Sequence, residues 1–429
     1  MFGFANFLLL ALFAAAVFDL IFALARGGGL RGALHGLWNT PHLLFGQQLA
    51  EWRLQLGRIL FAAGLAAYEI SVVFCNSMAR QNWAWVQGVM SPVLEWLAFL
   101  CFGAKILFGT RYTWQELLAG GALYFIARWV YFNSQNIWWI GIVVAVLAAK
   151  DVPLRRPLQV YFASGCAAMA VVLALHFAGI VAPDLTSERM GALRGTYGYG
   201  HPNTFGGLVF GLVLAYALLR AQKVRWVDCL LVFAVGVFLL VGPASRSAAL
   251  CTLALAVGLM FCRLRTGHSV PRWWPGTCAG MVGLTAAVSY LLPLLVIKVG
   301  PWNNDIGPAW LAKLDSLLTC RISLTWMAYR LLDVKIAGQV FNWPTVDNSF
   351  AFALFQFGPV VAALLGILFA AALWGHAKQG RRVEVCCLFA MLAYAYMEVQ
   401  PFHLTTNPTA LLLCGAVFAQ TSARWQKIE

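Results

Sequence analysis

Eleven polar residues of this sequence stand beside or between apolar runs, and their side chains could bind anions and move protons. A guanidinium group is a planar fork that suits phosphate oxygens, and four of the eleven are arginines: Arg194, Arg246, Arg321 and Arg330. Three are groups of the kind that serve as general acid or base: His201, Asp347 and Glu398. Four are neutral hydrogen-bonding neighbours: Asn203, Ser245, Asn348 and Asn407. Together they predict an anion-binding cavity capable of acid–base chemistry.

Each of these residues also has a plainer interpretation. An arginine at the end of a membrane span usually reaches to the lipid–water boundary and binds nothing. Asp347 and Asn348 could simply cap the helix that follows them, and His201 could be a satisfied boundary histidine. Glu398 could be no more than a polar helix end. These plainer interpretations are less convincing for the residues taken together, because so many charged groups gather on one predicted face of an apolar protein.

Motifs for nucleotides and metals give no support to a cofactor-dependent activity. The sequence contains no P-loop and no H-E-x-x-H. Its eleven cysteines form no C-x-x-C pair, and most lie in apolar runs, where cysteine acts as a small hydrophobic residue. We therefore expect neither a metal ion nor a cofactor.

The elements that would position the candidate residues are membrane helices. Of the 429 residues, 61% are hydrophobic and 11% are charged, whereas about a quarter of the residues of a soluble domain are charged. Apolar stretches long enough to cross a membrane recur along the chain, without the alternation of an outer-membrane barrel. The sequence therefore predicts an all-α polytopic integral membrane protein.

We expect twelve or thirteen transmembrane helices, depending on whether the first apolar stretch is counted. The predicted spans are residues 2–25, 58–76, 85–108, 114–131, 134–149, 158–182, 202–220, 227–242, 247–262, 276–298, 349–375, 383–399 and 408–422. Residues 1–57 form an N-terminal region whose cytoplasmic segment carries an interfacial helix near 42–57. Residues 58–429 form the core, with one long extracytoplasmic loop at 299–348.

The distribution of charge orients these spans. The net charge is +14, and all of it falls on the segments that the predicted spans place in the cytoplasm, as the positive-inside rule requires. This placement argues against a nucleic acid partner and for contact with anionic membrane lipid. It also puts every candidate residue named above on the outer side.

Two stretches on the outer side have predictable local structure. In residues 195–207, glycines let the chain turn tightly and Pro202 starts a returning helix. In the long loop, apolar residues at helical spacing predict an amphipathic helix: Ile322, Leu324, Met327 and Leu331.

At these residues the chain resembles bacterial polysaccharide repeat-unit polymerases of the Wzy type, which belong to the O-antigen polymerase and ligase superfamily. The resemblance rests on the order of "LRGTYGYGHPNTFG", "GPASRSAAL", "RISLTWMAYRLL" followed by "AGQVF", "DNSFAFALFQFGPVVAALLG", and the closing stretch from Glu398 to Asn407. Upstream, "CFGAKILFGTRYTWQELL" and "AAKDVPLRRPLQVYFASG" resemble the capsule and exopolysaccharide polymerases of Gram-positive bacteria. The likeness covers roughly residues 85–422.

This resemblance implies a metal-independent glycosyltransferase with a fold similar to membrane-embedded C-type (GT-C) transferases. Donor and acceptor are both oligosaccharides on undecaprenyl diphosphate. The growing glycan moves from its lipid to the non-reducing end of a new repeat unit, on the outer face of the bacterial cytoplasmic membrane. A flippase and a chain-length regulator of the same pathway are further expected partners.

The resemblance also implies a role for each arginine. Arg246 and Arg321 stabilise the leaving diphosphate, because placed positive charge can do this without a metal. Arg194 binds the acceptor's diphosphate or shares the same site, and Arg330 belongs to the same group. The four neutral residues named above position the substrate.

The general base stays open among Asp347, Glu398 and His201, in that order. Related O-antigen ligases have a histidine before the asparagine at the position of Asp347. The acidic residue here favours a polymerase over a ligase that serves another acceptor. A third alternative is a transporter of lipid-linked oligosaccharides. That class would require mid-membrane polar groups and often inverted repeats, and the sequence offers few of the former and none of the latter.

Overall fold

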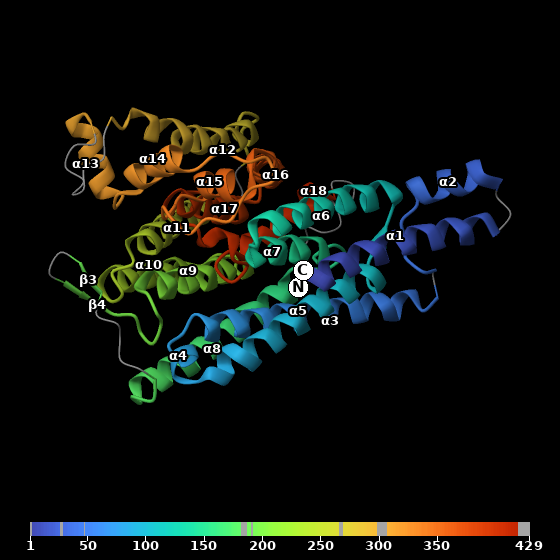
Figure 1. The fold of residues 1–429 in the computed structure, drawn as a ribbon, viewed down its shortest axis with the longest axis horizontal. Coiled ribbons are helices and arrows are strands. Elements are labelled where there is room, and N and C mark those ends of the chain that lie inside the picture. The colour runs from blue at the N-terminus through green and yellow to red at the C-terminus, as the bar shows by residue number, and fades with distance from the viewer. Residues whose placement is uncertain are drawn as a thin grey trace. The chain divides into compact units, whose positions relative to one another are not determined.

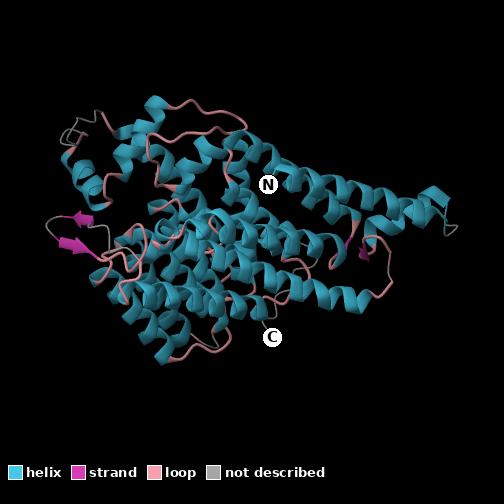
Figure 2. Ribbon diagram, turned by 60° about the horizontal axis from the view of Figure 1, so that its bottom comes forward, coloured by secondary structure: helices cyan, strands magenta, loops and turns pink. Residues whose placement is uncertain are grey.

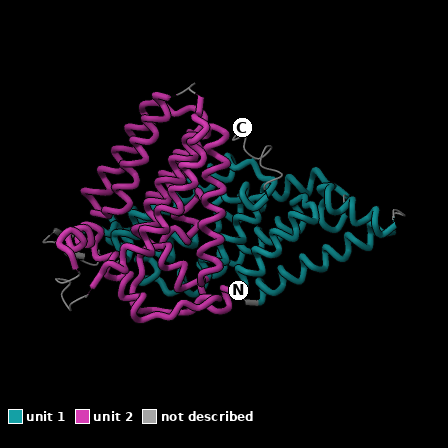
Figure 3. The backbone as a smooth tube through the Cα atoms, turned by 90° about the horizontal axis from the view of Figure 1, so that it is seen from above, with its two compact units in different colours: residues 1–128, 137–208, 410–429 teal, residues 129–136, 209–409 magenta. Residues whose placement is uncertain are grey.

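The structure, a computed structural model, describes residues 2–25, 29–46, 48–181, 187–189, 192–265, 269–297 and 307–418. Its regular structure is almost entirely helical, and the strands among these residues form two short antiparallel pairs (Figure 2). The chain divides into two compact units, which Figure 3 colours separately. Unit 1 contains residues 1–128, 137–208 and 410–429, and unit 2 contains residues 129–136 and 209–409.

Unit 1 consists mainly of long helices from the first half of the chain (Figure 1). Its helices are α1 (Phe2–Ala25), α2 (Gly29–Asn39), α3 (Ala50–Cys75), α4 (Ala79–Asn82), η1 (Val86–Met90), α5 (Ser91–Phe108), α6 (Trp114–Ser134), α7 (Ile137–Ala148), α8 (Arg155–Phe177) and α18 (Cys414–Val417). Its strand pairs are β1 (His42–Leu43) with β2 (Arg111–Tyr112), and β3 (Ser187–Arg189) with β4 (Ala192–Arg194). Helix α6 has its last residues in unit 2, and α9 (Pro202–Leu219) and η5 (Pro408–Leu413) also have residues in both units.

Small residues allow α3 and α5 to approach closely in unit 1. A Cβ atom at Gly64 would lie 2.7 Å from a ring carbon of Phe102, and one at Gly57 would lie 2.8 Å from the Cα atom of Gly109. Distances this short leave no room for a side chain. Helix α3 also packs against α8, so α3 is a central element of unit 1.

Unit 2 is built from helices of the second half of the chain. They are α10 (Trp226–Val241), α11 (Arg246–Leu264), α12 (Trp274–Leu291), η2 (Leu292–Leu295), α13 (Ala309–Leu317), α14 (Arg321–Leu331), α15 (Ser349–Phe352), η3 (Ala353–Phe357), α16 (Pro359–Lys378), α17 (Arg382–Met397) and η4 (Gln400–Phe402). Helix α11 packs against α10 and α17, and α12 packs against α16. These contacts bring the start of α11 and the end of α17 into one cluster, described below.

Eight helices in the described residues are long and apolar enough to cross a membrane: Gly3–Ala25, Ala50–Cys75, Val86–Phe108, Arg155–Phe177, Pro202–Leu219, Arg246–Leu264, Trp274–Leu295 and Pro359–Lys378. Three shorter apolar helices, Ile137–Ala148, Trp226–Val241 and Pro408–Val417, occupy further predicted spans. Helices α6 and α17 lie where the sequence predicts spans 114–131 and 383–399. The chain is therefore an all-α polytopic membrane protein, as the sequence predicts.

The predicted single span 349–375 is wrong, because the structure divides it. The π-helical turn η3 ends at Phe357, Gly358 adopts a positive φ of 87°, and α16 begins at Pro359. Proline lacks the N–H needed to continue the preceding helix, and a positive φ suits glycine. A Cβ atom at Gly358 would lie 2.1 Å from the carbonyl oxygen of Ile336. The backbone of the preceding loop at Ile336 therefore packs against this break.

The predicted interfacial helix near 42–57 is also wrong in its placement. A helix of this region, α2, lies earlier in the chain, and residues 50–57 belong to the start of α3. Between them come strand β1 and a turn in which Phe45 and Gly46 have positive φ angles of 61° and 93°. Those backbone angles are incompatible with a right-handed helix.

The helix predicted in the long loop 299–348 is confirmed as α14, but its buried face differs from the predicted apolar stripe. Ile322 is buried, whereas Leu331 is 58% exposed. Ser323 and Thr325 are buried instead, and the Thr325 hydroxyl donates to the Arg321 carbonyl at 2.7 Å. The helix docks through its first turns, where a buried arginine directs the packing. The loop's first residues, 299–306, and the predicted span ends at 182, 298 and 419–422 lie outside the described residues.

Candidate functional site

A buried ion pair joins Arg321, the first residue of α14, to Glu398, the residue after α17. Arg321 Nη2 lies 2.6 Å from Glu398 Oε1, and the two side chains are 7% and 6% exposed. Both residues come from the sequence-based candidates, and the structure brings them together. A charge-assisted bond of this length is among the strong hydrogen bonds of proteins.

The other donors of the Arg321 guanidinium bind the surrounding backbone and Ser247. Nε donates to the carbonyl of Met397, and Nη1 donates to the carbonyl of Leu318 at 2.9 Å. Nη2 also approaches Ser247 Oγ, in the first turn of α11, at 3.4 Å. Arg321 therefore holds the start of α14 to the end of α17 and the start of α11. A lysine has no comparable set of fixed donors.

The backbone around Arg321 is fixed by a local cap. Cys320 has a positive φ of 65°, so α14 starts after a sharp turn. Asp315 accepts hydrogen bonds at Oδ1 from the backbone N–H groups of Ile322 at 2.8 Å and Ser323 at 3.1 Å. These bonds satisfy N–H groups of the first helical turn and hold the arginine in place.

Glu398 lies directly after α17, where its carboxylate accepts from the Arg321 guanidinium. The Glu398 carbonyl accepts a hydrogen bond from Ser349 Oγ at 2.6 Å. The end of α17 is therefore tied to α14 through Arg321 and to the start of α15 through Ser349, which closely follows Asp347 in the chain.

Asn348 caps α15, which separates its role from that of Asp347. Asn348 Oδ1 accepts from the backbone N–H groups of Phe350 at 2.9 Å and Ala351 at 3.1 Å, and Nδ2 donates to Ser289 Oγ at 3.0 Å. This is the common use of an Asx residue at a helix start. Asp347 is only half-buried and does not serve as the cap. Its carboxylate therefore remains a candidate for chemistry.

We call Arg246, Ser247, Arg321, Asp347 and Glu398 the arginine cluster. Arg246, which precedes Ser247, is exposed at the first position of α11. A positive side chain at the positive end of a helix dipole attracts anions. The cluster therefore combines an exposed cation, a half-exposed carboxylate and a buried ion pair.

The remaining candidates of unit 2 are Ser245, Asn407 and Arg330. Ser245 is buried immediately before α11. Asn407 is buried, donates from Nδ2 to the Pro401 carbonyl at 2.9 Å and accepts from Thr409 Oγ1 at 2.5 Å. Arg330 is exposed, with its guanidinium carbon 5.8 Å from the centre of the Trp326 ring. None of these observations assigns these three residues to a substrate.

Three candidates lie together in unit 1. Arg194 is buried and donates from Nη2 to Asn203 Oδ1 at 2.9 Å. The backbone N–H of Asn203 donates to Nδ1 of the exposed His201 at 3.1 Å. Nδ1 therefore acts as an acceptor, so a donor role for this imidazole falls to Nε2. The predicted start of the helix at Pro202 is confirmed.

The glycine-rich stretch before His201 is anchored within unit 1. The Gly198 carbonyl accepts from the backbone N–H of Met78 at 2.8 Å, and Ser77 and Tyr199 form an isolated β-bridge. Gly198 has a positive φ of 81°, and a Cβ atom there would lie 3.0 Å from His176 Cβ. A glycine is needed at this position because the backbone passes close to α8.

Sequence reasoning missed a second buried charge cluster, in unit 1. We call Lys105, Glu116, Lys150 and Asp151 the lysine cluster. Lys150 Nζ lies 3.2 Å from Glu116 Oε1 and 3.6 Å from Asp151 Oδ1, and its side chain is 1% exposed. Lys105, also fully buried, donates to Thr110 Oγ1 at 2.6 Å and to the Lys150 carbonyl. Lys150, which lies between the predicted spans 134–149 and 158–182, is therefore an interior ion-pair partner.

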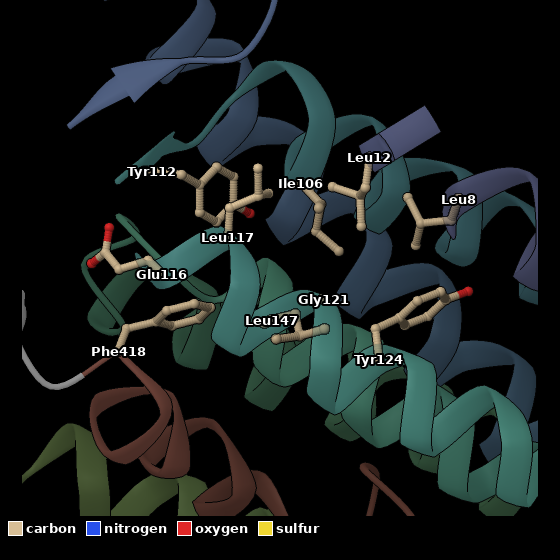
Figure 4. Close-up of a pocket in the computed structure, with 11 residues that line it drawn as sticks. Leu8, Leu12, Ile106, Tyr112, Glu116, Leu117, Gly121, Tyr124, Leu147 and Phe418 are labelled. Carbon is tan, nitrogen blue, oxygen red and sulfur yellow. The ribbon is translucent and has the colours of Figure 1, made fainter. Parts of the chain in front are cut away.

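Aromatic rings enclose the lysine cluster. Lys150 Nζ lies 5.7 Å from the centre of the Tyr112 ring and 5.5 Å from that of Phe418, which are cation–π distances. Tyr112, Glu116 and Phe418 also line a cavity of about 20 Å³ (Figure 4). A space of this size holds roughly one water molecule and no substrate.

Two sequence signals could have indicated this cluster. Lys105 interrupts an apolar run, and an ionisable residue within a membrane span usually has a partner. "TWQE" at 113–116 is a capping box: the Thr113 N–H donates to Glu116 Oε2 at 2.9 Å, and the Glu116 N–H donates to Thr113 Oγ1 at 3.2 Å. The capping box fixes the glutamate that receives Lys150.

The described residues contain no group of three or more His, Cys, Asp or Glu side chains that could hold a metal ion. No family model, no curated protein and no solved structure matches the chain. The chemistry of the arginine cluster must therefore be argued from its own residues.

Proposed function

We propose that the protein is a glycosyltransferase of the bacterial cytoplasmic membrane that polymerises lipid-linked oligosaccharide repeat units on the outer face. In this reaction the growing glycan leaves undecaprenyl diphosphate and joins the non-reducing end of a new repeat unit on the same type of lipid. The proposal includes a GT-C-like fold with twelve or thirteen spans. Its strongest support is the arginine cluster, where a buried Arg–Glu pair is bonded to Ser247 and Ser349, and the half-buried Asp347 closely precedes Ser349 in the chain.

Asp347 is the proposed general base. It takes the proton of the acceptor sugar hydroxyl while that oxygen bonds to the anomeric carbon of the donor glycan. The bond from this carbon to the diphosphate oxygen breaks, and undecaprenyl diphosphate leaves with the electron pair. Asp347 suits this role because it is only half-buried and leaves the capping of α15 to Asn348. A positioned base contributes about 10²–10⁴-fold to the rate.

Arg246 is the proposed partner of the leaving diphosphate. Its side chain is exposed at the start of α11, where the helix dipole also favours an anion. Arg321 supports the site in a different way, because its donors bind Glu398, Ser247 and two backbone carbonyls. We infer that Arg321 and Glu398 together set the electrostatic environment of Asp347. Arg194, Asn203 and His201 form a separate polar group within unit 1, and we propose that this group binds a lipid-linked substrate.

The arginine cluster must face outward for this reaction, and cysteine labelling tests that orientation. Lys335, in the long loop, and Gln379, after α16, are both exposed. In a chain carrying Cys320→Ser, we expect Lys335→Cys to react with an impermeant thiol reagent in intact cells and Gln379→Cys to react only after lysis. The opposite pattern would place the cluster in the cytoplasm and refute the proposed reaction.

A further inference from the structure

Two cysteine side chains from different helices of unit 2 contact each other. Cys262 Sγ, near the end of α11, lies 3.5 Å from Cys386 Sγ, in the second turn of α17. We call Cys262 and Cys386 the thiol pair. Helices α11 and α17 pack against each other, and both belong entirely to unit 2. The contact is therefore part of the packing between two neighbouring helices of one compact unit.

The two helices approach closely at the thiol pair because a glycine faces Cys386. A Cβ atom at Gly258, one turn before Cys262 on α11, would lie 3.1 Å from Cys386 Sγ and 3.3 Å from Cys386 Cβ. The Cys386 side chain therefore rests on the face of α11 that carries Gly258 and Cys262. Forming an S–S bond of about 2.05 Å requires the two sulfur atoms to approach further, but it does not require the helices to exchange neighbours.

A hydrogen bond between helix ends holds the thiol pair in place, and charged residues surround it in the chain. Arg382, one turn before Cys386, donates from Nη1 to the carbonyl of Arg265, the residue after α11. Arg382 and Arg263 bring two positive charges to these helix ends, and Glu384 brings one negative charge. Cationic side chains near a thiol favour the thiolate, which is the nucleophile in thiol oxidation. Both the geometry and the net local charge therefore suit oxidation of the pair.

The two thiols differ in their exposure at the protein surface. Cys262 is 7% exposed, whereas Cys386 is half-buried. A small oxidant such as hydrogen peroxide therefore reaches Cys386 more easily, and Cys262 is placed to attack the oxidised sulfur. An accessible cysteine beside a second, resolving cysteine is the common arrangement of reversible thiol oxidation sites.

We propose that the thiol pair is a modification site at which hydrogen peroxide forms a reversible disulfide. The Cys386 thiolate attacks one peroxide oxygen, the O–O bond breaks, and hydroxide leaves, so that Cys386 becomes a sulfenic acid. The Cys262 sulfur then attacks the Cys386 sulfur, the S–O bond breaks, and the S–S bond forms. The two thiol protons end in two water molecules. The thiols lose two electrons, and one peroxide molecule gains them.

The disulfide joins the two helices that also carry part of the arginine cluster at their opposite ends. Ser247 lies in the first turn of α11, and Glu398 directly follows α17. In the orientation proposed above, the thiol pair lies at the cytoplasmic end of both helices. Thiols are kept reduced in the cytoplasm, so there the bond forms only when oxidant is supplied. The modification itself does not depend on the proposed polymerase activity.

Counting the thiols of the purified full chain tests the proposal. The reduced protein is treated with hydrogen peroxide, unfolded, alkylated with N-ethylmaleimide and analysed by mass spectrometry. Without peroxide, all eleven cysteines should be alkylated. After peroxide, two fewer should react, and a peptide that joins Cys262 to Cys386 should appear. Dithiothreitol should restore both thiols. A loss that dithiothreitol does not reverse would indicate oxidation beyond the sulfenic acid and would contradict the proposal.

Cys387→Ser is the matched control, because Cys387 is adjacent to Cys386 but fully buried. This variant should still lose two thiols, whereas Cys262→Ser and Cys386→Ser should form no disulfide. Dimedone should trap a sulfenic acid at Cys386 in Cys262→Ser. Thermal unfolding of the reduced proteins checks that all three variants fold. A parent chain that keeps all eleven thiols, or a disulfide that persists in Cys386→Ser, would overturn the proposal.

Discussion

The arginine cluster and the lysine cluster both bury ionised side chains in an apolar protein, but they are constructed differently. In the lysine cluster, Lys150 is enclosed by Glu116, Asp151 and two aromatic rings, beside a space for about one water molecule. In the arginine cluster, the buried pair lies beside a half-exposed carboxylate and an exposed arginine. Each cluster has a half-buried aspartate, Asp151 or Asp347, but only the second also has an exposed arginine, Arg246.

Because of this difference, we expect the lysine cluster to affect only stability and the arginine cluster to affect activity as well. Charges that pair only with one another can join helix ends, but they offer no exposed cation to an anionic substrate. The arginine cluster can present the exposed Arg246 and the Asp347 carboxylate while the buried pair keeps its geometry. Removing one partner of either buried pair leaves the other charge unpaired in the interior, which commonly costs about 3–5 kcal/mol. Only variants of the arginine cluster should also lose activity per folded molecule.

The largest combined effect is expected for Arg321→Ala. The substitution leaves the Glu398 carboxyl and two backbone carbonyls without their donors. We expect the free energy of unfolding to fall by about 3–5 kcal/mol and glycan extension to stop. Thermal unfolding in detergent and an extension assay measure the two effects. Arg330→Ala, at the exposed end of the same helix, should change stability by less than about 0.5 kcal/mol. Equal stability losses would show that the Arg321–Glu398 pair contributes nothing.

A purely structural loss is expected for Glu116→Ala. This change removes the nearest carboxylate from buried Lys150 and breaks the capping box of α6. The free energy of unfolding should fall by about 3–5 kcal/mol, while turnover per folded molecule stays at the parent value. The matched control is Glu51→Gln, because Glu51 pairs with Arg111 at 3.3 Å with its own side chain 82% exposed. That variant should behave like the parent chain. A turnover defect in folded Glu116→Ala would mean that the lysine cluster also takes part in chemistry.

The smallest effect is expected for Asn348→Ala, which removes the α15 cap beside the proposed base. Loss of such a cap costs about 1 kcal/mol. Turnover should fall only moderately, because Asp347 keeps its carboxylate. A turnover loss as large as that of an Asp347 variant would assign the chemistry to the asparagine instead.

The helical class and many span positions followed from the sequence, because long apolar runs can satisfy their backbone in a membrane only as helices. Pro202 also marked a helix start correctly. The division at Gly358 was missed because it depends on a contact with Ile336, which local sequence does not reveal. The buried face of α14 was missed because a docked arginine, not apolar spacing, directs it.

The sequence indicated which residues belong to the candidate site, but not which of them contact one another. Arg321 and Glu398 are 77 residues apart in the chain, and only the fold makes them neighbours. Either Asp347 or Asn348 could have capped the helix that follows, and hydrogen bonds assign the cap to Asn348. The burial of Lys150 was not predictable from its place between two predicted spans, because its partner Glu116 is distant in the sequence.

The central claim is that the arginine cluster performs glycan polymerisation with Asp347 as base. The most direct measurement incubates the purified protein with undecaprenyl-diphosphate-linked repeat units and resolves the products by glycan length. The parent chain should give a ladder of lengths, and Asp347→Asn should bind the lipid-linked substrate yet extend it about 10²–10⁴-fold more slowly. A parent chain that leaves the units unchanged, or an Asp347→Asn chain that extends them at the parent rate, would contradict the claim.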